Sequence, residues 1–410
     1  MTVARVGHTA TLLGNHDVLV VGGYGSGGIM ALAEFYDPVA TLWRSTGDLN
    51  VPRMGHAATL LANGNVLVTG GYGSSGITAS TEIYDISSGT WSMAANMSGP
   101  RSYHSTIRLL NGSVLLVGGQ DVNGVLAASA ELYDPLTGSW SLTGNLNVAR
   151  AGHTAILLPT GHILVAGGRD STGPVVSAEL YDPLTGSWSL TGNLNIARDG
   201  HTATLLGNNG DVFVAGGYGN GGVLADAEIY HIDDLTTGQG HWVVANNLHV
   251  SRAGHSATLL SNNTVFITGG VGDDGTLTSS ELYDTTTGQW TLTGSLGVPR
   301  SLHTATLLQD GSLLVAGGTP LRSDRLSAER VTPGVQVVLE WDRVSDPAVL
   351  GYKVYYGTAS KPYQGLTILD REVRYIFGNL TKGATYYFAV TSFSGIGESC
   401  SSNEVSKVIP

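Results

Sequence analysis

The side chains in this chain that could do metal or acid–base chemistry recur at fixed places. An arginine and a histidine stand three residues apart seven times, at Arg5/His8, Arg53/His56, Arg101/His104, Arg150/His153, Arg198/His201, Arg252/His255 and Arg300/His303. Imidazole is the commonest metal ligand in proteins. A zinc-type site, however, needs about three or four ligands at about 2 Å, and seven evenly spread copies cannot share one. We therefore predict structural histidines and no metal site.

Seven glutamates accompany these pairs, one in each copy. They are Glu34, Glu82, Glu131, Glu179, Glu228, Glu281 and Glu329. A glycosidase would need two carboxyl groups about 5 to 9.5 Å apart in one pocket, which one identical glutamate per copy does not provide. We predict instead a structural ion pair in each copy, as between Arg53 and Glu82 or Arg150 and Glu179. No catalytic residue is predicted.

The element that must position these pairs is a repeat of about fifty residues. The anchor arginines lie 48 residues apart at the first step (5 to 53) and 54 apart at the longest (198 to 252), where the stretch from His231 to His241 is extended. Each copy holds four runs of strand length, rich in Val, Leu, Thr and Tyr and separated by Gly, Asn, Asp and Ser. Four strands per repeat are typical of a propeller blade.

The repeat resembles the kelch family. Its marks are the doublet Gly167-Gly168 at the end of the second strand, Tyr181 in the third and Trp188 in the fourth, and we assign Trp188 a structural role. The resemblance covers residues 1–333 and implies an all-β, seven-bladed β-propeller. Copy seven keeps Glu329 but has no following tryptophan strand, so we expect the last blade to lack its outer strand. The chain begins inside this pattern, and we expect further sequence upstream.

Residues 334–410 have a different composition and form a second predicted domain. All four lysines and the only cysteine, Cys400, lie beyond residue 340. Trp341, Leu380 and Tyr386 stand where a fibronectin type III domain has its core tryptophan, its leucine and its corner tyrosine. The resemblance implies a C-terminal β-sandwich, with a role as spacer or adhesion module.

The run from Arg101 to Ser105 also resembles galactose oxidase, a kelch-type propeller in which an adjacent tyrosine and histidine bind copper. Carried over, the copper ligands would be Tyr103 and His104. That family also needs a cross-linked cysteine and a histidine from the C-terminal domain, whereas this chain has no cysteine before Cys400 and no histidine after His303. We therefore predict no cofactor.

The residues that follow the glycine doublets differ from copy to copy, and variable loops on a fixed scaffold are where binding specificity usually lies. An aromatic ring there can stack on a sugar or anchor a protein interface. The predicted ligand-binding residues are Tyr24, Tyr72, Gln120, Arg169, Tyr218 and Asp273. The alternative, that these tyrosines only pack on neighbouring loops, stays open.

The composition excludes some partners. The formal net charge is −12, with 20 Lys and Arg against 32 Asp and Glu, which disfavours nucleic acid and anionic lipid. No apolar run is long enough to span a bilayer. Abundant Gly, Ser and Thr and a single cysteine suit an extracellular or cell-surface protein. We expect a binding or scaffold protein without catalytic activity, whose ligand is a glycan or a protein; the alternative is a carbohydrate-active enzyme such as a galactose-oxidase-like oxidase.

Overall fold

The computed structural model describes residues 1–207, 209–319, 328–333, 335–342, 344–346, 348–360, 362–369, 374–380, 384–394, 397–399, 402 and 404–408. The chain divides into two compact units. The first comprises Met1–Trp290 and Leu296–Val331, and the second Thr291–Ser295 and Thr332–Pro410. The domain limits predicted from the sequence, 1–333 and 334–410, stay a prediction.

Among its described residues, the first unit has seven larger antiparallel sheets, one for each repeat, and five two-stranded hairpins. The innermost strands are β1 (Thr9–Leu12), β7 (Ala57–Leu60), β13 (Ser105–Arg108), β17 (Thr154–Leu157), β23 (Thr202–Leu205), β29 (Ser256–Leu259) and β35 (Thr304–Leu307). The second strands are β2 (Val18–Val21), β8 (Val66–Thr69), β14 (Val114–Val117), β18 (Ile163–Ala166), β24 (Val212–Ala215), β30 (Thr264–Thr268) and β36 (Leu313–Ala316).

The outer half of each sheet completes the blade. The third strands are β5 (Ala33–Asp37), β11 (Thr81–Asp85), β15 (Ala130–Asp134), β21 (Ala178–Asp182), β27 (Ala227–Ile232), β33 (Ser280–Asp284) and β37 (Ala328–Val331). The fourth strands are β6 (Leu42–Ser45), β12 (Thr90–Met93), β16 (Ser139–Leu142), β22 (Ser187–Leu190), β28 (Gly240–Ala245) and β34 (Gln289–Thr293). Among the described residues the seventh sheet has three strands, β35-β36-β37, as predicted for the last blade.

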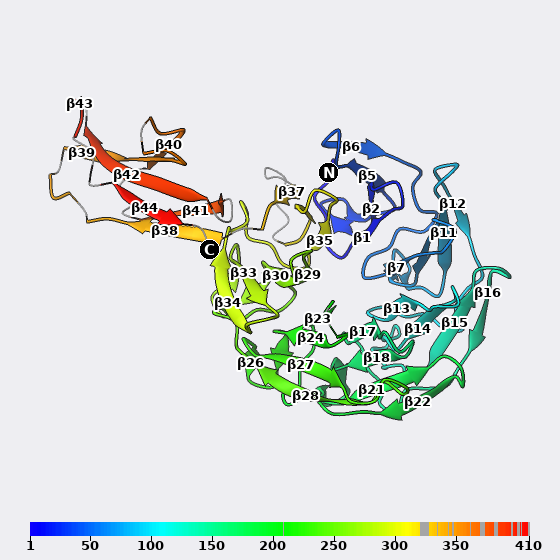
Figure 1. The fold of residues 1–410 in the computed structure, drawn as a ribbon. Coiled ribbons are helices and arrows are strands. Elements are labelled where there is room, and N and C mark those ends of the chain that lie inside the picture. The colour runs from blue at the N-terminus through cyan, green and yellow to red at the C-terminus, as the bar shows by residue number, and fades with distance from the viewer. Residues whose placement is uncertain are drawn as a thin grey trace. The chain divides into compact units, whose positions relative to one another are not determined.

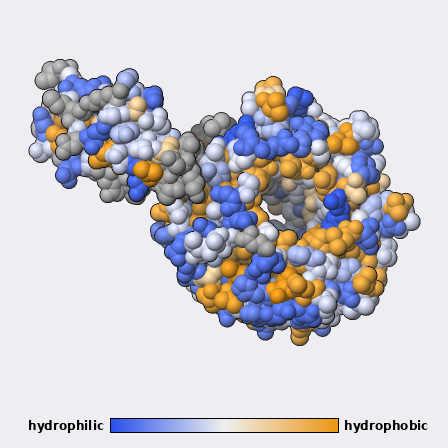
Figure 2. All heavy atoms as spheres, in the orientation of Figure 1, coloured by the Kyte–Doolittle hydropathy of each residue, from blue (hydrophilic) through white to orange (hydrophobic). Residues whose placement is uncertain are grey.

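The sheets close into a ring (Figure 1). Each innermost strand lies beside the next, and β35 lies beside β1. A backbone hydrogen bond from Gly318 N to Arg5 O, 2.8 Å, joins the last copy to the first. Seen along the ring axis, the unit has an opening at its centre (Figure 2). The all-β propeller fold expected from the repeat is therefore confirmed, with seven sheets that fit the seven repeats.

The side chains of each second strand point alternately towards the two neighbouring blades, and their packing holds the blades together. All four residues of β2 are buried, and successive side chains point to opposite faces of the sheet. Leu19 and Val21 pack against Val66 and Val68 of the second blade, whereas Val18 and Val20 pack with Leu314 of the seventh. The second strands are thus buried on both faces of their sheets, which explains why they read as continuous apolar runs.

The second unit is a small antiparallel β-structure. Its strands are β38 (Val335–Glu340), β39 (Val349–Gly357), β40 (Gly365–Leu369), β41 (Arg374–Leu380), β42 (Thr385–Ser394), β43 (Gly397–Glu398) and β44 (Val405–Val408). Strand β38 pairs with β41, whereas β39 pairs with β40 and β42. Tyr352, Val354, Phe377 and Phe388 are buried at its core. Among the described residues of the whole chain, no helix is long and apolar enough to cross a membrane.

Candidate functional site

The anchor arginine and glutamate of each blade form a buried ion pair. In the fourth blade, Arg150 Nη2 lies 2.8 Å from Glu179 Oε1, and both side chains are fully buried. Arg150 Nη1 donates to the carbonyl oxygens of Gly167 and Ser177, which flank the loop between the second and third strands. The pairs are Arg5–Glu34, Arg53–Glu82, Arg101–Glu131, Arg150–Glu179, Arg198–Glu228, Arg252–Glu281 and Arg300–Glu329.

The same glutamate also holds the connection that enters the blade. Glu179 accepts hydrogen bonds from the backbone N–H groups of Asn147 and Val148. Burial lowers the pKa of Arg150, and the negative charge of Glu179 raises it in part. Because every hydrogen-bonding group of the pair is directed at a loop base, the pair fixes the loops and leaves no carboxyl group for acid–base chemistry.

The seven histidines lie between neighbouring blades. His201 Nε2, for example, shares a hydrogen bond of 3.1 Å with Thr154 Oγ1 of the preceding blade. Burial and, to a smaller extent, the nearby charge of Arg198 lower the pKa of His201 to about 3, so the ring is neutral near pH 7. Burial also lowers the pKa of the other six: His8, His56, His104, His153, His255 and His303.

The glycine doublet is required at the same contact between neighbouring blades. Gly167 has φ of +59°, and a Cβ atom there would lie 2.7 Å from both Arg198 O and the His201 ring. The next glycine, Gly168, donates its N–H to Arg198 O at 2.8 Å. At the rim, Trp188 packs on Tyr181 with ring centroids 5.1 Å apart, and its Nε1 donates to Gly144 O of the preceding blade. These residues hold the scaffold.

The residue after each doublet occupies one equivalent position in all seven blades. It bridges to the residue that follows the anchor arginine, as Tyr24 does to Val6 and Tyr218 to Asp199. Five of these positions open short hairpins: β3 (Tyr24–Gly25) with β4 (Gly28–Ile29), β9 (Tyr72–Gly73) with β10 (Gly76–Ile77), β19 (Arg169–Asp170) with β20 (Gly173–Pro174), β25 (Tyr218–Gly219) with β26 (Gly222–Val223), and β31 (Val271–Gly272) with β32 (Gly275–Thr276). The predicted Asp273 stands two residues beyond this position.

Three of the predicted residues meet in a chain of contacts across the second, third and fourth blades. Gln120 Nε2 donates to the Tyr72 hydroxyl at 3.3 Å, and Arg169 Nη2 donates to Gln120 Oε1 at 3.2 Å. Two further residues, which were not among the ligand-binding residues predicted from the sequence, extend this series of contacts. Tyr72 packs edge-on against Tyr103, with centroids 6.2 Å apart, and Arg169 Nη1 lies 3.6 Å from Asp199 Oδ2. We call these five residues the face cluster.

The electrostatics of the face cluster distinguish it from the scaffold pairs. Burial raises the pKa of Asp199, and the charge of Arg169 opposes that shift. The Arg169 side chain is 44 % exposed, unlike the buried anchor arginines. Gln120 and Arg169 also line a groove of about 780 Å³ together with Asn123, Leu126 and Asn147. An exposed guanidinium group, an amide and two tyrosines therefore lie side by side on the face of the propeller that carries the loops after the glycine doublets. We call this face the loop face.

The other predicted ligand residues are not members of the face cluster, although the Tyr218 backbone pairs with that of Asp199. Tyr24 is 43 % exposed on the first hairpin. Tyr218 is similarly exposed, with its ring close enough to Gly200 that a Cβ there would lie 3.6 Å from it. Asp273 accepts a hydrogen bond from Ser251 Oγ at 2.8 Å.

The sequence indicated Tyr103 only as a copper ligand implied by resemblance and did not indicate Asp199, because both follow an anchor arginine and not a doublet. The available signal for Tyr103 was a broken pattern. Five copies have glycine just before the anchor histidine, whereas the third has Tyr103 and the seventh Leu302. Both keep the left-handed backbone of those glycines, with φ of 53° and 54°. A bulky residue in that region is strained and often marks a functional surface.

The side chains near Tyr103 and His104 do not fit a copper centre. His104 is buried, and its Nε2 shares a hydrogen bond of 2.7 Å with Thr69 Oγ1 of the preceding blade. Tyr103 is 44 % exposed and packs on Tyr72. In the part of the chain that the structure describes, no three His, Cys, Asp or Glu side chains gather as metal ligands.

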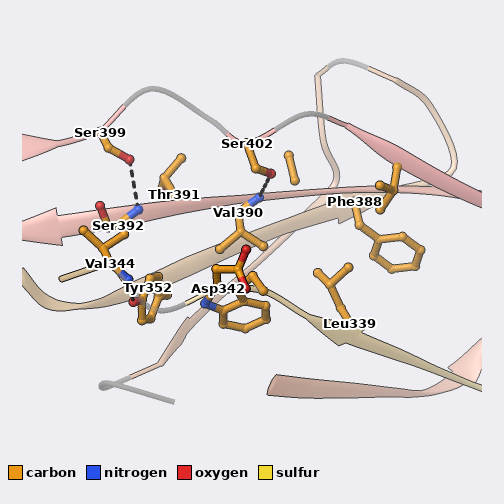
Figure 3. A pocket seen from close by; sticks show the side chains of 13 residues that line it. Leu339, Asp342, Val344, Tyr352, Phe388, Val390, Thr391, Ser392, Ser399 and Ser402 are labelled. Atoms are coloured by element: carbon orange, nitrogen blue, oxygen red, sulfur yellow. Dashed lines mark hydrogen bonds between the residues drawn. The ribbon is translucent and has the colours of Figure 1, made fainter. Parts of the chain in front are cut away.

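The second unit has a cleft of its own (Figure 3). Leu339, Tyr352, Phe388 and Val390 form its apolar wall, and Ser392, Ser399 and Ser402 line it on the β42 side. Two of these serines hydrogen-bond to β42, Ser402 Oγ with Val390 N and Ser399 Oγ with Ser392 N. No residue predicted to bind a ligand lies in this cleft.

Comparisons with known proteins bear on both units. The model of the KLHDC2/KLHL20/DRC7 Kelch-repeats domain matches residues 7–190 and 104–318. The fibronectin type III domain model matches residues 320–408. No curated protein matches the chain. Both resemblances inferred from the sequence are therefore confirmed.

Among solved structures, the chain is similar to a fungal alcohol oxidase, titled "Novel fungal alcohol oxidase with catalytic diversity among the AA5 family, in complex with copper". The identity is 17 %, the TM-score is 0.67, and the match covers 99 % of this chain and 98 % of the other. This likeness supports the propeller resemblance. At this identity it shows the fold alone.

One expectation needs correction. We expected a chain without enzymatic activity, because the cross-linked cysteine and C-terminal histidine of the galactose oxidase family are absent from the sequence. The match to a solved structure titled an alcohol oxidase covers 99 % of this chain, so the same fold is found in an enzyme and the expectation does not stand. A missing ligand set excludes one metal chemistry and not catalysis as a class, so we withdraw the assignment.

Proposed function

This chain belongs to the kelch-repeat family and carries a fibronectin type III domain, an architecture that fits a binding scaffold, and we propose that it binds a glycan or a protein through the loop face of its propeller. The observation that carries this proposal is the face cluster of Tyr72, Tyr103, Gln120, Arg169 and Asp199. Its members come from four different blades, so the contacts follow from ring closure and not from one local motif.

The chemistry of the face cluster suits a polar ligand with flat apolar faces. The two tyrosines offer ring surfaces for a sugar or an aliphatic side chain. Gln120 and Arg169 offer planar donors that can pair with hydroxyl, carboxylate or carbonyl groups. The adjoining groove gives such a ligand a concave surface to enter.

A protein ligand is the second form of this proposal, favoured by the kelch repeats themselves. Tyrosine and arginine are the residue types most enriched at the energetic centres of protein interfaces. An acidic chain with a single cysteine also suits an extracellular or cell-surface location, and we propose that setting with no nucleic acid partner.

The test compares two variants in the same assays. We expect a glycan array probed with the purified chain to give a binding signal. Tyr72→Ala and Arg169→Ala should each lower this signal tenfold or more, since each removes one side chain of the face cluster. Tyr24→Ala is the matched control, an exposed tyrosine at an equivalent position outside the cluster. Leu184→Ala, on the turn between the third and fourth strands, controls for the other face.

Different outcomes separate the two ligand classes. No glycan signal, together with a protein captured by the intact chain and lost with Tyr72→Ala, would assign the face to a protein partner. Binding that survives both cluster variants but is lost with Tyr24→Ala would refute the face cluster as the site. In each case circular dichroism of the variants checks that the propeller is folded.

A further inference from the structure

The fifth blade carries an extension that no other blade has. Its outer strands β27 and β28 run for six residues each, whereas the corresponding strands of the other complete blades have four or five. The two extra pairs of this ladder are Ala227 with Ala245 and Ile232 with Gly240, one at each end. His231 pairs with His241 at the position where other blades pair an aspartate with a threonine or serine, as Asp85 pairs with Thr90, so two histidines lie directly opposite each other on neighbouring strands.

The two rings are close enough to share a ligand. Opposed residues of an antiparallel pair point to the same face of the sheet. The ring centroids of His231 and His241 are 5.8 Å apart. A metal bound at about 2.0 to 2.1 Å from an imidazole nitrogen lies roughly 3 Å from that ring's centroid, so one ion between the rings is compatible with this separation. Both side chains are accessible, with exposed fractions of 39 % and 56 %.

Each ring is also held by a carboxylate on one nitrogen. His231 Nδ1 lies 2.6 Å from Asp211 Oδ2, and His241 Nδ1 lies 2.8 Å from Asp233 Oδ2. A carboxylate partner places the proton on Nδ1 and leaves Nε2 with its lone pair. Metal-binding histidines in proteins are characteristically oriented in this way by a second group.

We propose that His231 and His241 bind one divalent transition-metal ion of the Zn²⁺, Ni²⁺ or Cu²⁺ type through their Nε2 atoms. Imidazole nitrogen suits these ions, whereas Mg²⁺ and Ca²⁺ prefer oxygen. Since no three ligating side chains gather among the described residues, the protein supplies two ligands and water completes the coordination. The site lies where the third strand turns into the fourth, away from the loops that carry the face cluster.

The remaining histidines do not provide a competing pair. Of the 12 histidines in the chain, seven are the buried inter-blade residues. The other three are committed singly: His16 to Gln309, His162 to Thr160, and His249 to Glu281. Among the ring contacts of the described residues, only His231 and His241 form a histidine pair.

The experiment is a calorimetric titration of the full chain, freed of metal, with Zn²⁺ and separately with Ni²⁺ at pH 7.5. We expect one site per chain, lost in His231→Ala and in His241→Ala. Asp233→Asn is expected to weaken the affinity by about tenfold to a hundredfold, because it removes the group that orients His241. His162→Ala, a partly buried histidine of the same propeller face, should leave the titration unchanged.

A second readout keeps the result independent of protein stability. Electron paramagnetic resonance of the chain with one equivalent of Cu²⁺ should show two nitrogen ligands in the wild type and fewer in His241→Gln, whose melting temperature checks that it is folded. The proposal is overturned if the wild-type chain binds none of the three ions, or if binding survives in both single alanine variants.

Discussion

The outer strands of the six complete blades are held by contacts that the described residues of the seventh blade lack. In each complete blade a buried tyrosine of the third strand packs on a tryptophan of the fourth, with ring centroids 5.0 to 5.2 Å apart. In the seventh, Arg330 and Val331 end the third strand and no tryptophan strand follows among the described residues. Its anchor pair differs too, because Arg300 uses Nε to reach Glu329, which is 14 % exposed.

The seventh blade nevertheless keeps every contact that closes the ring. His8 shares a hydrogen bond with Thr304, and Gly318 N donates to Arg5 O. The glycine-to-arginine backbone bond recurs between all neighbouring blades, and the histidine bond recurs except at His153, whose Nε2 has no partner among the described residues. Ring closure therefore depends on the inner strands, the anchor arginine and the doublet. The tyrosine–tryptophan rim adds stability to a blade without deciding whether the ring closes.

Lowering the pH should weaken all seven contacts between neighbouring blades, which we call the joints. This is the largest effect on stability that we expect. The pKa is lowered to about 3 in the folded chain for five of the inter-blade histidines, among them His8 and His303, against about 6.5 when unfolded. For His56 and His255 the pKa is likewise lowered well below its usual value. Between these values the unfolded chain binds more protons, so stability is complete above pH 6.5 and is lost as the pH falls towards 3. Urea unfolding followed by tryptophan fluorescence should show a falling midpoint from pH 7 to pH 4.

Hydrogen exchange at pH 7 and pH 5 locates this loss. Equal loss of protection in β18 of the fourth blade and β36 of the seventh would support joints of one kind. Early exchange of β36 alone would contradict it, and would make the incomplete blade the weak point of the ring.

Removing one partner of the anchor pair should separate complete from incomplete blades. Arg150→Met leaves Glu179 buried without its cation, and we expect a loss of about 3 to 5 kcal/mol. Arg300→Met leaves a glutamate with partial access to water, for which about 1 to 3 kcal/mol is expected. Chemical denaturation of the two variants measures the difference, and equal losses would refute it. Arg44→Met, at an exposed pair with Asp37, is the control.

The scaffold was readable from the sequence because each part recurs seven times. The doublet at Gly167-Gly168 and the anchor Arg150 stand at fixed spacings, and only a ring of like blades gives each copy the same neighbours. The face cluster was readable only in part. Tyr72, Gln120 and Arg169 follow doublets, but their contacts cross blade boundaries about 48 residues apart in the chain. No local pattern reports which loops meet in space.

The histidine pair of the fifth blade shows the same limit. The sequence gives the extra length between His231 and His241 but no strand register. A shift by one residue would place the two rings on opposite faces of the sheet. Register comes from the packing of Tyr230 on Trp242, the neighbouring pair of the ladder.

A smaller effect is expected at the hydrogen bond that joins complete blades at their rim. The Tyr181 hydroxyl lies 2.8 Å from Thr143 Oγ1 of the preceding blade. Tyr181→Phe should cost about 1 kcal/mol, and Thr143→Val about the same, because each removes one hydrogen bond. A double variant measures their coupling. Additive losses in the double variant would show that the two groups do not act as one bond.

The smallest effect should be a gain. Leu302 of the seventh blade has φ of 54° at a position where five blades have glycine. Leu302→Gly removes strain of about 1 to 2 kcal/mol, offset by about 0.5 to 1 kcal/mol of extra chain entropy in the unfolded state, so stability should rise by up to about 1 kcal/mol. Tyr103→Gly should gain less, because it also loses the contact with Tyr72. Thermal unfolding of both variants tests this order.

The short hairpins on the loop face have a consequence for engineering and for divergence. Each is anchored at its base by a backbone bridge and by the arginine that binds the doublet carbonyl. At tips such as Gly27 and Gly221, a Cβ atom would have no atom within 4 Å except those of its chain neighbours. A tip can therefore be exchanged without rebuilding its blade. The hairpin of one blade can thus be replaced to give that blade a new binding specificity, while the hairpins of the other blades keep theirs.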